Sequence, residues 1–163
     1  MEPLSVGVHA VSTLAQLRTG QSIAVWGAGP VGLLCMAVAK ALGASRIVAV
    51  DINPARLEFA QSYVATNVFL PPAQNTGENK AEYSKRAAEA LKQTLGIKDR
   101  GPTAIDVVIE ASGAEVSIQT AWFVVKTGGT YVQVWRRILR ASVSNSFTRS
   151  GWVCPISWSP STC

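Results

Sequence analysis

Three glycines in one short run carry the clearest chemical signal of the sequence. The run GAGPVG places Gly27, Gly29 and Gly32 between an apolar stretch and a segment with a helical pattern. In this spacing the first glycine makes a sharp turn, the second leaves room for phosphate oxygens, and the third lets the helix lie close to the strand. Backbone N–H groups at the start of that helix then face the phosphate. The run predicts a site for the pyrophosphate of a dinucleotide.

An acidic residue at a second strand end strengthens this interpretation. Asp51 lies 19 residues after Gly32, directly behind the apolar run 47–50. A carboxylate at this point accepts hydrogen bonds from the ribose hydroxyls of the adenosine half and repels a 2′-phosphate. The sequence therefore indicates NAD rather than NADP as the cofactor.

The elements that must position these residues follow from alternating apolar runs and helical patterns. We expect strands at residues 22–27, 46–51, 67–70, 105–110 and 130–134, and helices at 6–18, 30–42, 54–63, 80–95 and 114–125. Apolar strands separated by helices predict a parallel sheet that is buried on both faces. Right-handed crossovers then give a doubly wound α/β fold of strand order 3-2-1-4-5, with the glycine run at its switch point.

Composition limits the classes of partner. The 163 residues are 48% hydrophobic and 15% charged, which fits one globular domain. The net charge is +5, but residues 1–134 hold 11 Lys and Arg against 10 Asp and Glu, so the remaining +4 comes from later arginines. Since no platform of basic and aromatic residues is evident, we expect no specific nucleic acid partner.

The cysteines and apolar runs give no sign of a metal site or a membrane segment. The three cysteines form no CxxC, and His9 is the single histidine. Cys35 is expected to be a buried, reduced thiol. The longest apolar run, 31–39, is far shorter than the roughly 20 residues of a membrane span, and we expect no secretory signal. We expect a cytoplasmic protein without membrane contact.

The sequence changes character at Trp135. Residues 135–163 contain no Asp, Glu or Lys and follow no strand or helix period. They are either a disordered tail or residues out of register with the preceding fold, as after a lost reading frame. We favour the second hypothesis, because the three tryptophans of this segment would be costly to expose. The predicted division is a dinucleotide-binding domain at 1–134 and an irregular tail at 135–163. Strand five would then be an exposed edge through which copies of the chain could pair.

Several longer segments resemble one enzyme family. EPLSVGVHA, GAGPVGLL, AVDINPARLEFA, VIEASGAE and GGTYVQV are similar to segments of the zinc-dependent medium-chain polyol dehydrogenases, above all the fungal xylitol and sorbitol dehydrogenases. The resemblance covers residues 1 to about 134. It implies a Rossmann-type NAD-binding domain, in an enzyme that oxidises a secondary alcohol of a polyol to a ketose while zinc polarises the alcohol.

The resemblance also assigns roles to individual residues. The positions that it places around NAD are Gly27, Gly29, Pro30, Val31, Gly32, Asp51, Ile52, Arg56, Ala111 and Val134. The three glycines would lie under the pyrophosphate and Val31 near the cofactor. Asp51 would contact the adenosine ribose hydroxyls with the help of Arg56, and Ala111 and Val134 would lie where the nicotinamide half passes. Glu2 matches a family glutamate beside the catalytic zinc.

The family's other zinc ligands precede the part that this chain resembles. We therefore expect no zinc on this chain, no complete catalytic site, and little or no polyol oxidation by the chain alone. The alternative is a noncatalytic module that binds NAD or pairs with another subunit. A methyltransferase that uses S-adenosylmethionine also has a glycine loop and an acid after strand two, but it does not account for the spacing in GAGPVG.

Overall fold

The computed structural model describes residues 2–134 and 139–142 of the chain. Within them, six strands form one sheet in the order β3-β2-β1-β4-β5-β6. The strands are β1 (Ser22–Trp26), β2 (Arg46–Val50), β3 (Asn67–Phe69), β4 (Ile105–Glu110), β5 (Val125–Gln133) and β6 (Leu139–Ser142). β1 to β5 are parallel, and β6 is antiparallel to β5. The predicted doubly wound α/β fold is confirmed.

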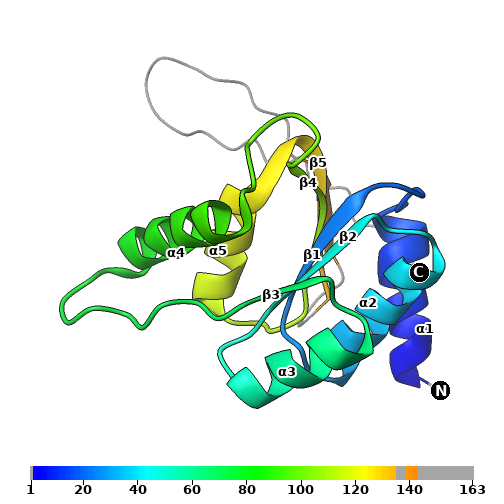
Figure 1. Ribbon diagram of the computed structural model, residues 1–163, viewed down its shortest axis with the longest axis horizontal. Coiled ribbons are helices and arrows are strands. Elements are labelled where there is room, and N and C mark those ends of the chain that lie inside the picture. The colour runs from blue at the N-terminus through cyan, green and yellow to red at the C-terminus, as the bar shows by residue number, and fades with distance from the viewer. Residues whose placement is uncertain (1, 135–138, 143–163) are drawn as a thin grey trace.

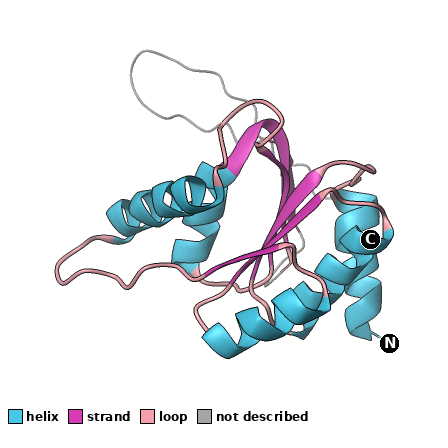
Figure 2. Ribbon diagram, in the orientation of Figure 1, coloured by secondary structure: helices cyan, strands magenta, loops and turns pink. Residues whose placement is uncertain are grey.

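Helices cover both faces of the sheet (Figures 1 and 2). They are α1 (Glu2–Val8), the π-helix η1 (His9–Leu14), α2 (Pro30–Ala41), α3 (Pro54–Tyr63), α4 (Lys80–Leu95) and α5 (Glu115–Val124). η1, α2 and α3 pack on one face, α1 lies against α2, and α4 and α5 pack on the other face. None of the helices in the described residues has the length and apolar character needed to cross a membrane.

The core explains why β1 reads as an unbroken apolar run. Ile23 and Val25 belong to the cluster beneath α2 and α3, whereas Ala24 and Trp26 belong to the cluster beneath α4 and α5. Successive side chains of a strand point to opposite faces, so a sheet covered on both faces needs apolar residues at every position. All five residues of β1 are buried accordingly.

Capping residues fix the helix boundaries that the sequence predicted well. The Asn53 side chain accepts hydrogen bonds from the backbone N–H groups of Ala55 and Arg56, at 3.0 and 3.4 Å, and Pro54 begins α3. Asn79 and Glu82 form a reciprocal capping box at the start of α4. Both helices span the predicted residues because the caps leave little freedom in where they start.

The first helical segment differs from the prediction of a helix at 6–18. It begins at Glu2, widens into η1, and ends before Gln16, whose φ of +51° is left-handed. The Ala15 N–H donates to Ala10 O at 2.9 Å, five residues back, which is the hydrogen bond of a π-turn. Apolar spacing marked a helix here but did not reveal the wider turn.

β5 is longer than the predicted strand at 130–134. It starts at Val125, opposite Ile105, but its next pair joins Thr130 to Val107, so the intervening residues bulge out of the ladder. Gly128 has a φ of +76°, which suits a bulge. The sequence pair Gly128-Gly129 marked a turn, and the structure uses it inside a strand.

The prediction that strand five is an exposed edge is wrong. β6 pairs with β5 in antiparallel register, from Thr130 opposite Ser142 to Gln133 opposite Leu139. The segment expected to be an irregular tail therefore contributes a strand, and the fold does not stop at strand five. Backbone pairing needs no side-chain period, so the pattern of the sequence could not reveal it. The rest of the predicted tail, 135–138 and 143–163, lies outside the described residues.

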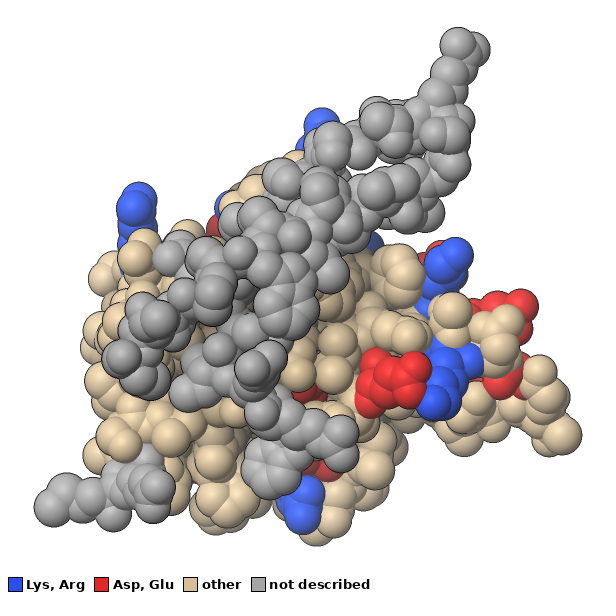
Figure 3. Space-filling view, turned by 180° about the vertical axis from the view of Figure 1, so that it is seen from behind, with Lys and Arg blue, Asp and Glu red and all other residues tan. Residues whose placement is uncertain are grey.

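Charged side chains of both signs surround α4. Viewed from behind, most of the visible Lys, Arg, Asp and Glu side chains lie on the side of α4 and α5 (Figure 3). Ion pairs join Lys80 to Glu115 and Lys92 to Asp99. Intermixed charges suit a solvated surface better than a nucleic acid backbone, which needs a basic stripe.

A charged clasp holds the loop that joins β3 to α4. The Arg86 guanidinium donates to both carboxylate oxygens of Glu78, at 2.8 and 2.7 Å, and to Ala73 O at 2.8 Å. The Tyr83 hydroxyl donates to Pro72 O at 3.0 Å. The hydrogen bond from Arg86 is the main cause that lowers the pKa of Glu78 from 4.5 to about 2.

The clasp predicts a specific pH dependence. Because the folded-state pKa of Glu78 is depressed, its contribution to stability is present above pH 4.5 and is lost as the pH falls toward 2. We expect Glu78→Gln to lower Tm at pH 6, and the difference in Tm from the unsubstituted chain to shrink between pH 4.5 and pH 2. Thermal melts across this range measure it. Glu58→Gln, on the exposed face of α3, is the control and should show no such convergence.

Candidate functional site

The carboxyl ends of three neighbouring strands bring the predicted site residues together. β1 lies between β2 and β4, with Trp26 opposite both Val50 and Glu110. The residues that follow these strands therefore lie at one edge of the sheet: Gly27 after β1, Asp51 after β2 and Ala111 after β4. In a doubly wound sheet this edge, at the point where the strand order reverses, is where ligands bind.

Two of the three glycines are required by the packing of the protein itself. Gly27 has a φ of +95°, and a Cβ there would lie 3.0 Å from the backbone N of Ser112 and 3.1 Å from the carbonyl carbon of Ala111. A Cβ on Gly32 would lie 1.8 Å from Gly27 O, far inside contact distance. The loop thus fits tightly between α2 and the segment after β4.

Gly29 is different, because nothing in the described part of the chain restricts it. Its φ of −78° and ψ of −179° are open to any residue. A Cβ built there meets no atom of residues 2–134 or 139–142 within 4 Å. The space in front of Gly29 is therefore open on the outer side of the loop, where the second glycine of such a run leaves room for phosphate.

The start of α2 points its backbone donors toward this open space. Gly29 is the N-cap and accordingly provides no side-chain cap, Pro30 is the first helical residue, and the first turn contains no acid. Val31 is partly buried and Gly32 is buried. A helix start without an internal anionic partner favours an external anion.

Asp51 is nearly buried and ties the glycine loop to the start of α3. One carboxylate oxygen accepts from Ala28 N at 2.7 Å, and the other accepts from Asn53 N at 2.8 Å. The Arg56 guanidinium lies 3.9 Å from the carboxylate and is largely exposed. Ile52, next to Asp51, is 80% exposed. The structure therefore brings Asp51 and Arg56 together, and it gives Asp51 a structural role that the sequence did not reveal.

The two residues expected beside the nicotinamide half lie at adjacent strand ends. Ala111 N donates to Trp26 O, and Val134 N donates to Glu110 O, both at 2.8 Å. Glu110 itself is fully buried and was not predicted as a site residue. The signal that could have found it is an acid at the end of an apolar strand, followed at once by Ser and Gly.

The described residues do not supply a zinc site. They contain no group of three or more His, Cys, Asp or Glu that could hold a metal ion. Glu2 is the first residue of α1, and His9 begins η1. Cys35 is buried in α2, and burial raises the pKa of its thiol to about 12, so it stays protonated. The donor set of this part of the chain does not fit the metal.

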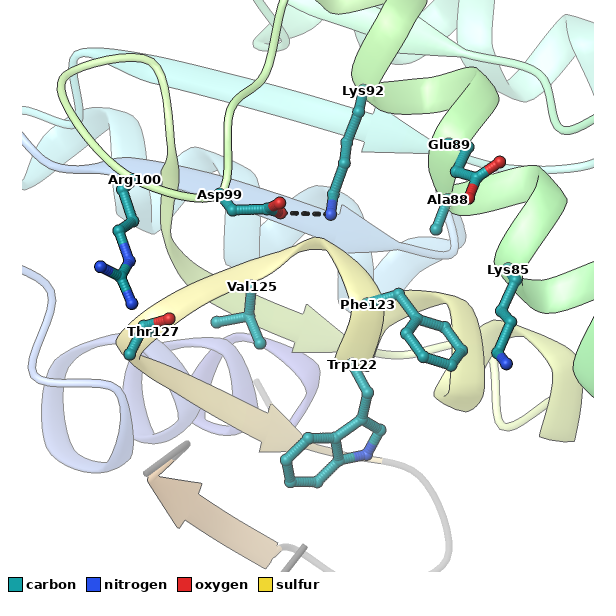
Figure 4. Close-up of a pocket in the computed structure, with 10 residues that line it drawn as sticks. All are labelled: Lys85, Ala88, Glu89, Lys92, Asp99, Arg100, Trp122, Phe123, Val125 and Thr127. Carbon is teal, nitrogen blue, oxygen red and sulfur yellow. Dashed lines mark hydrogen bonds and ion pairs between the residues drawn. The ribbon is translucent and has the colours of Figure 1, made fainter. Parts of the chain in front are cut away.

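A cavity of about 530 Å³ lies at the other end of the sheet, between α4, α5 and the start of β5 (Figure 4). The Lys92–Asp99 ion pair lies along it, and the side chains of Phe123 and Val125 contribute to its wall. Since it borders the amino end of β5, it is not part of the edge that carries the glycine loop.

Comparison with known proteins identifies the family. A family model described as zinc-binding dehydrogenase matches residues 30–134. The chain belongs to this family. The matched region covers the candidate site from Pro30 to Val134, while Gly27 and Gly29 precede it. The resemblance noted in the sequence is confirmed.

The chain is similar to D-xylulose reductases of two fungi. A probable D-xylulose reductase A of Aspergillus terreus is 53% identical over 133 residues, which are 82% of this chain and 34% of that protein. D-xylulose reductase A of Aspergillus niger is 51% identical over 134 residues, with the same coverage. The chain thus spans about a third of the length of these relatives.

A solved structure supports the same assignment. Alcohol dehydrogenase TADH from Thermus sp. ATN1 has a TM-score of 0.58 and 33% sequence identity. The match covers 82% of this chain and 35% of that one. Sequence and structure therefore agree on the family of the part that they cover.

The different environments of the glycines predict different effects of the same substitution. Gly32→Ala must push α2 away from the glycine loop, and we expect it to lower the free energy of unfolding by about 3 kcal/mol. Gly29→Ala meets no atom of the described residues but replaces the N-cap of α2 with a poorer one, so it should cost only about 1 kcal/mol or less. Urea denaturation of both variants measures the difference; equal stabilities would contradict the packing described above.

Proposed function

We propose that this chain is the dinucleotide-binding part of an NAD-dependent polyol dehydrogenase, with residues 1–134 as the binding unit. The observation that carries the proposal is the open space at Gly29. This space lies at the start of α2, which has no side-chain cap, and beside Asp51 at the end of β2. Packing among the described residues requires glycine at positions 27 and 32 but not at 29, which favours a ligand as the reason for the third glycine.

The residues of this edge divide into groups that would hold different parts of NAD. Gly29, Val31 and Gly32 offer backbone N–H groups for the pyrophosphate, with Gly27 and Pro30 shaping the turn. Asp51 would accept hydrogen bonds from the adenosine ribose, flanked by Ile52 and Arg56. Ala111 and Val134 would lie beside the nicotinamide half. When bound, NAD supplies the hydride acceptor for oxidation of a secondary alcohol.

The environment of Asp51 supports NAD over NADP. Its carboxylate is held by the N–H groups of Ala28 and Asn53, so it cannot swing away from the strand end. A 2′-phosphate at the same place would meet a fixed negative charge. Arg56 lies 3.9 Å from that carboxylate, which offsets its attraction for a phosphate.

The polyol substrate and the zinc ion are proposed for the whole enzyme, not for this chain alone. The D-xylulose reductases that the chain matches favour a sugar alcohol as the substrate class. Glu2 would lie beside the zinc in such an enzyme. Zinc itself is not expected on this chain, because the described residues bring no group of donors that fits it.

Gly29→Ala tests the cofactor site without disturbing the fold. Its Cβ would occupy the open space that we assign to the pyrophosphate, and we expect NAD affinity to fall about tenfold or more. The Kd for NAD and NADP is measured by NMR titration on the unsubstituted chain and the variant. The unsubstituted chain should prefer NAD. If Gly29→Ala binds NAD as the unsubstituted chain does, the site is not at this loop. Asp51→Ala is a poorer probe, because it also removes two backbone hydrogen bonds.

Turnover separates cofactor binding from complete catalysis. Given NAD, zinc and xylitol or sorbitol, we expect the 163-residue chain to bind NAD but to form little or no NADH. NADH formation is followed by its absorbance, with an intact D-xylulose reductase as the positive control. A rate near that of the control would show that the chain holds a complete catalytic site. Binding without turnover also fits the alternative of a noncatalytic NAD-binding module.

A further inference from the structure

We infer that Glu110 is a positioning residue that fixes the nicotinamide side of the cofactor site. This inference rests on the proposed function. It concerns a carboxylate that lies at the end of β4, is fully buried, and takes part in no ion pair within the described residues. A buried carboxylate without a cationic partner is costly unless hydrogen-bond donors surround it.

Within the described residues, the donors to the Glu110 carboxylate come from the segment that follows it. Its Oε1 accepts from Ser112 N at 2.9 Å, from Ser112 Oγ at 2.5 Å and from Gly113 N at 3.0 Å. Its Oε2 lies 3.2 Å from Gly113 N. Four contacts from two consecutive residues to one side chain hold the turn 111–113 in one conformation. Gly113 takes a φ of +73° in that turn.

The turn held by Glu110 is packed directly against the glycine loop. A Cβ on Gly27 would approach Ser112 N to 3.0 Å and Ala111 O to 3.2 Å, so the two backbones are in contact there. Ala111 N also donates to Trp26 O at 2.8 Å. A change in the conformation of the turn 111–113 would therefore shift the glycine loop where it contacts the end of β4. Asp51 holds Ala28 on the opposite side of the loop.

Glu110 also holds the second segment expected beside the nicotinamide half. Its backbone carbonyl accepts from Val134 N at 2.8 Å, at the end of β5. One residue thus holds the turn 111–113 through its side chain and Val134 through its main chain. Asp51 performs the corresponding task on the adenosine side, through Ala28 and Asn53. The two halves of the cofactor site are fixed by different carboxylates.

This separation predicts that Glu110 acts on one half of the ligand. Glu110→Gln keeps the shape of the side chain but removes its charge and turns an acceptor into a donor. The new amide group must either face Gly113 N–H or give up the contacts at Oε1. We expect the Kd for NAD to rise about tenfold. The Kd for AMP, which contacts only the adenosine side, should stay within about twofold.

Asp106→Asn is the matched control. Asp106 lies at the opposite end of the same strand and accepts from Ser22 N and Ser22 Oγ, both at 2.8 Å, while pairing with Lys126. Its loss should lower Tm and leave the ratio of the two Kd values unchanged. A role of Glu110 in general stability would instead make both variants alike.

The experiment titrates AMP and NAD into the unsubstituted chain, Glu110→Gln and Asp106→Asn, and follows amide hydrogen exchange of Ser112 and Gly113. A selective loss of NAD affinity in Glu110→Gln, with faster exchange at these two amides, supports the inference. An unchanged ratio of Kd values overturns it and leaves the proposed function intact, whereas failure of the unsubstituted chain to bind NAD overturns both. If Glu110→Gln does not fold, Ser112→Ala removes one of the four contacts and should give a smaller selective loss; no selective loss would overturn the inference.

Discussion

The architecture of the site depends on how closely α2 approaches the end of β1. A Cβ on Gly32 would lie 1.8 Å from Gly27 O, so the helix can take this position only with glycine there. That contact sets the direction of α2 and therefore the direction of its N-terminal donors. The turn after β4 closes on Gly27 from the other side, and Asp51 holds Ala28. A loop fixed on three sides needs no ligand to take its shape.

The buried carboxylates of Asp51 and Glu110, at neighbouring strand ends, are stabilised in the same way. Burying a charged group is costly, and Asp51 and Glu110 both meet that cost with backbone N–H donors that would otherwise also need partners. Each acid therefore stabilises a turn and is stabilised by it. Asp51 lies 3.9 Å from the exposed guanidinium of Arg56, whereas Glu110 takes part in no ion pair within the described residues. This difference suits Asp51 to meet a ligand and Glu110 to hold the backbone that meets one.

Much of this fold could be predicted from the sequence, because its central elements are determined locally. Unbroken apolar runs marked β1 and β4, and the caps at Asn53 and Asn79 fixed the starts of α3 and α4. The failures lie where backbone hydrogen bonds rather than side chains decide. The π-turns of η1, the bulge in β5 and the antiparallel β6 leave no period in the side chains. A pattern of side chains cannot report a hydrogen bond between main chains.

The candidate site could be predicted in part, and its glycines show why. The run GAGPVG reads as one motif, yet the structure divides it: Gly27 and Gly32 are required by packing, and Gly29 is not. Two of the three glycines would therefore persist in any chain that keeps this close strand–helix turn, whatever it binds. The features that favour a ligand are the open space at Gly29 and the acid at position 51. Glu110 was not predicted because its partners are backbone amides of the next turn. The residue types of Ser112 and Gly113 indicate a turn, but they do not indicate which side chain stabilises it.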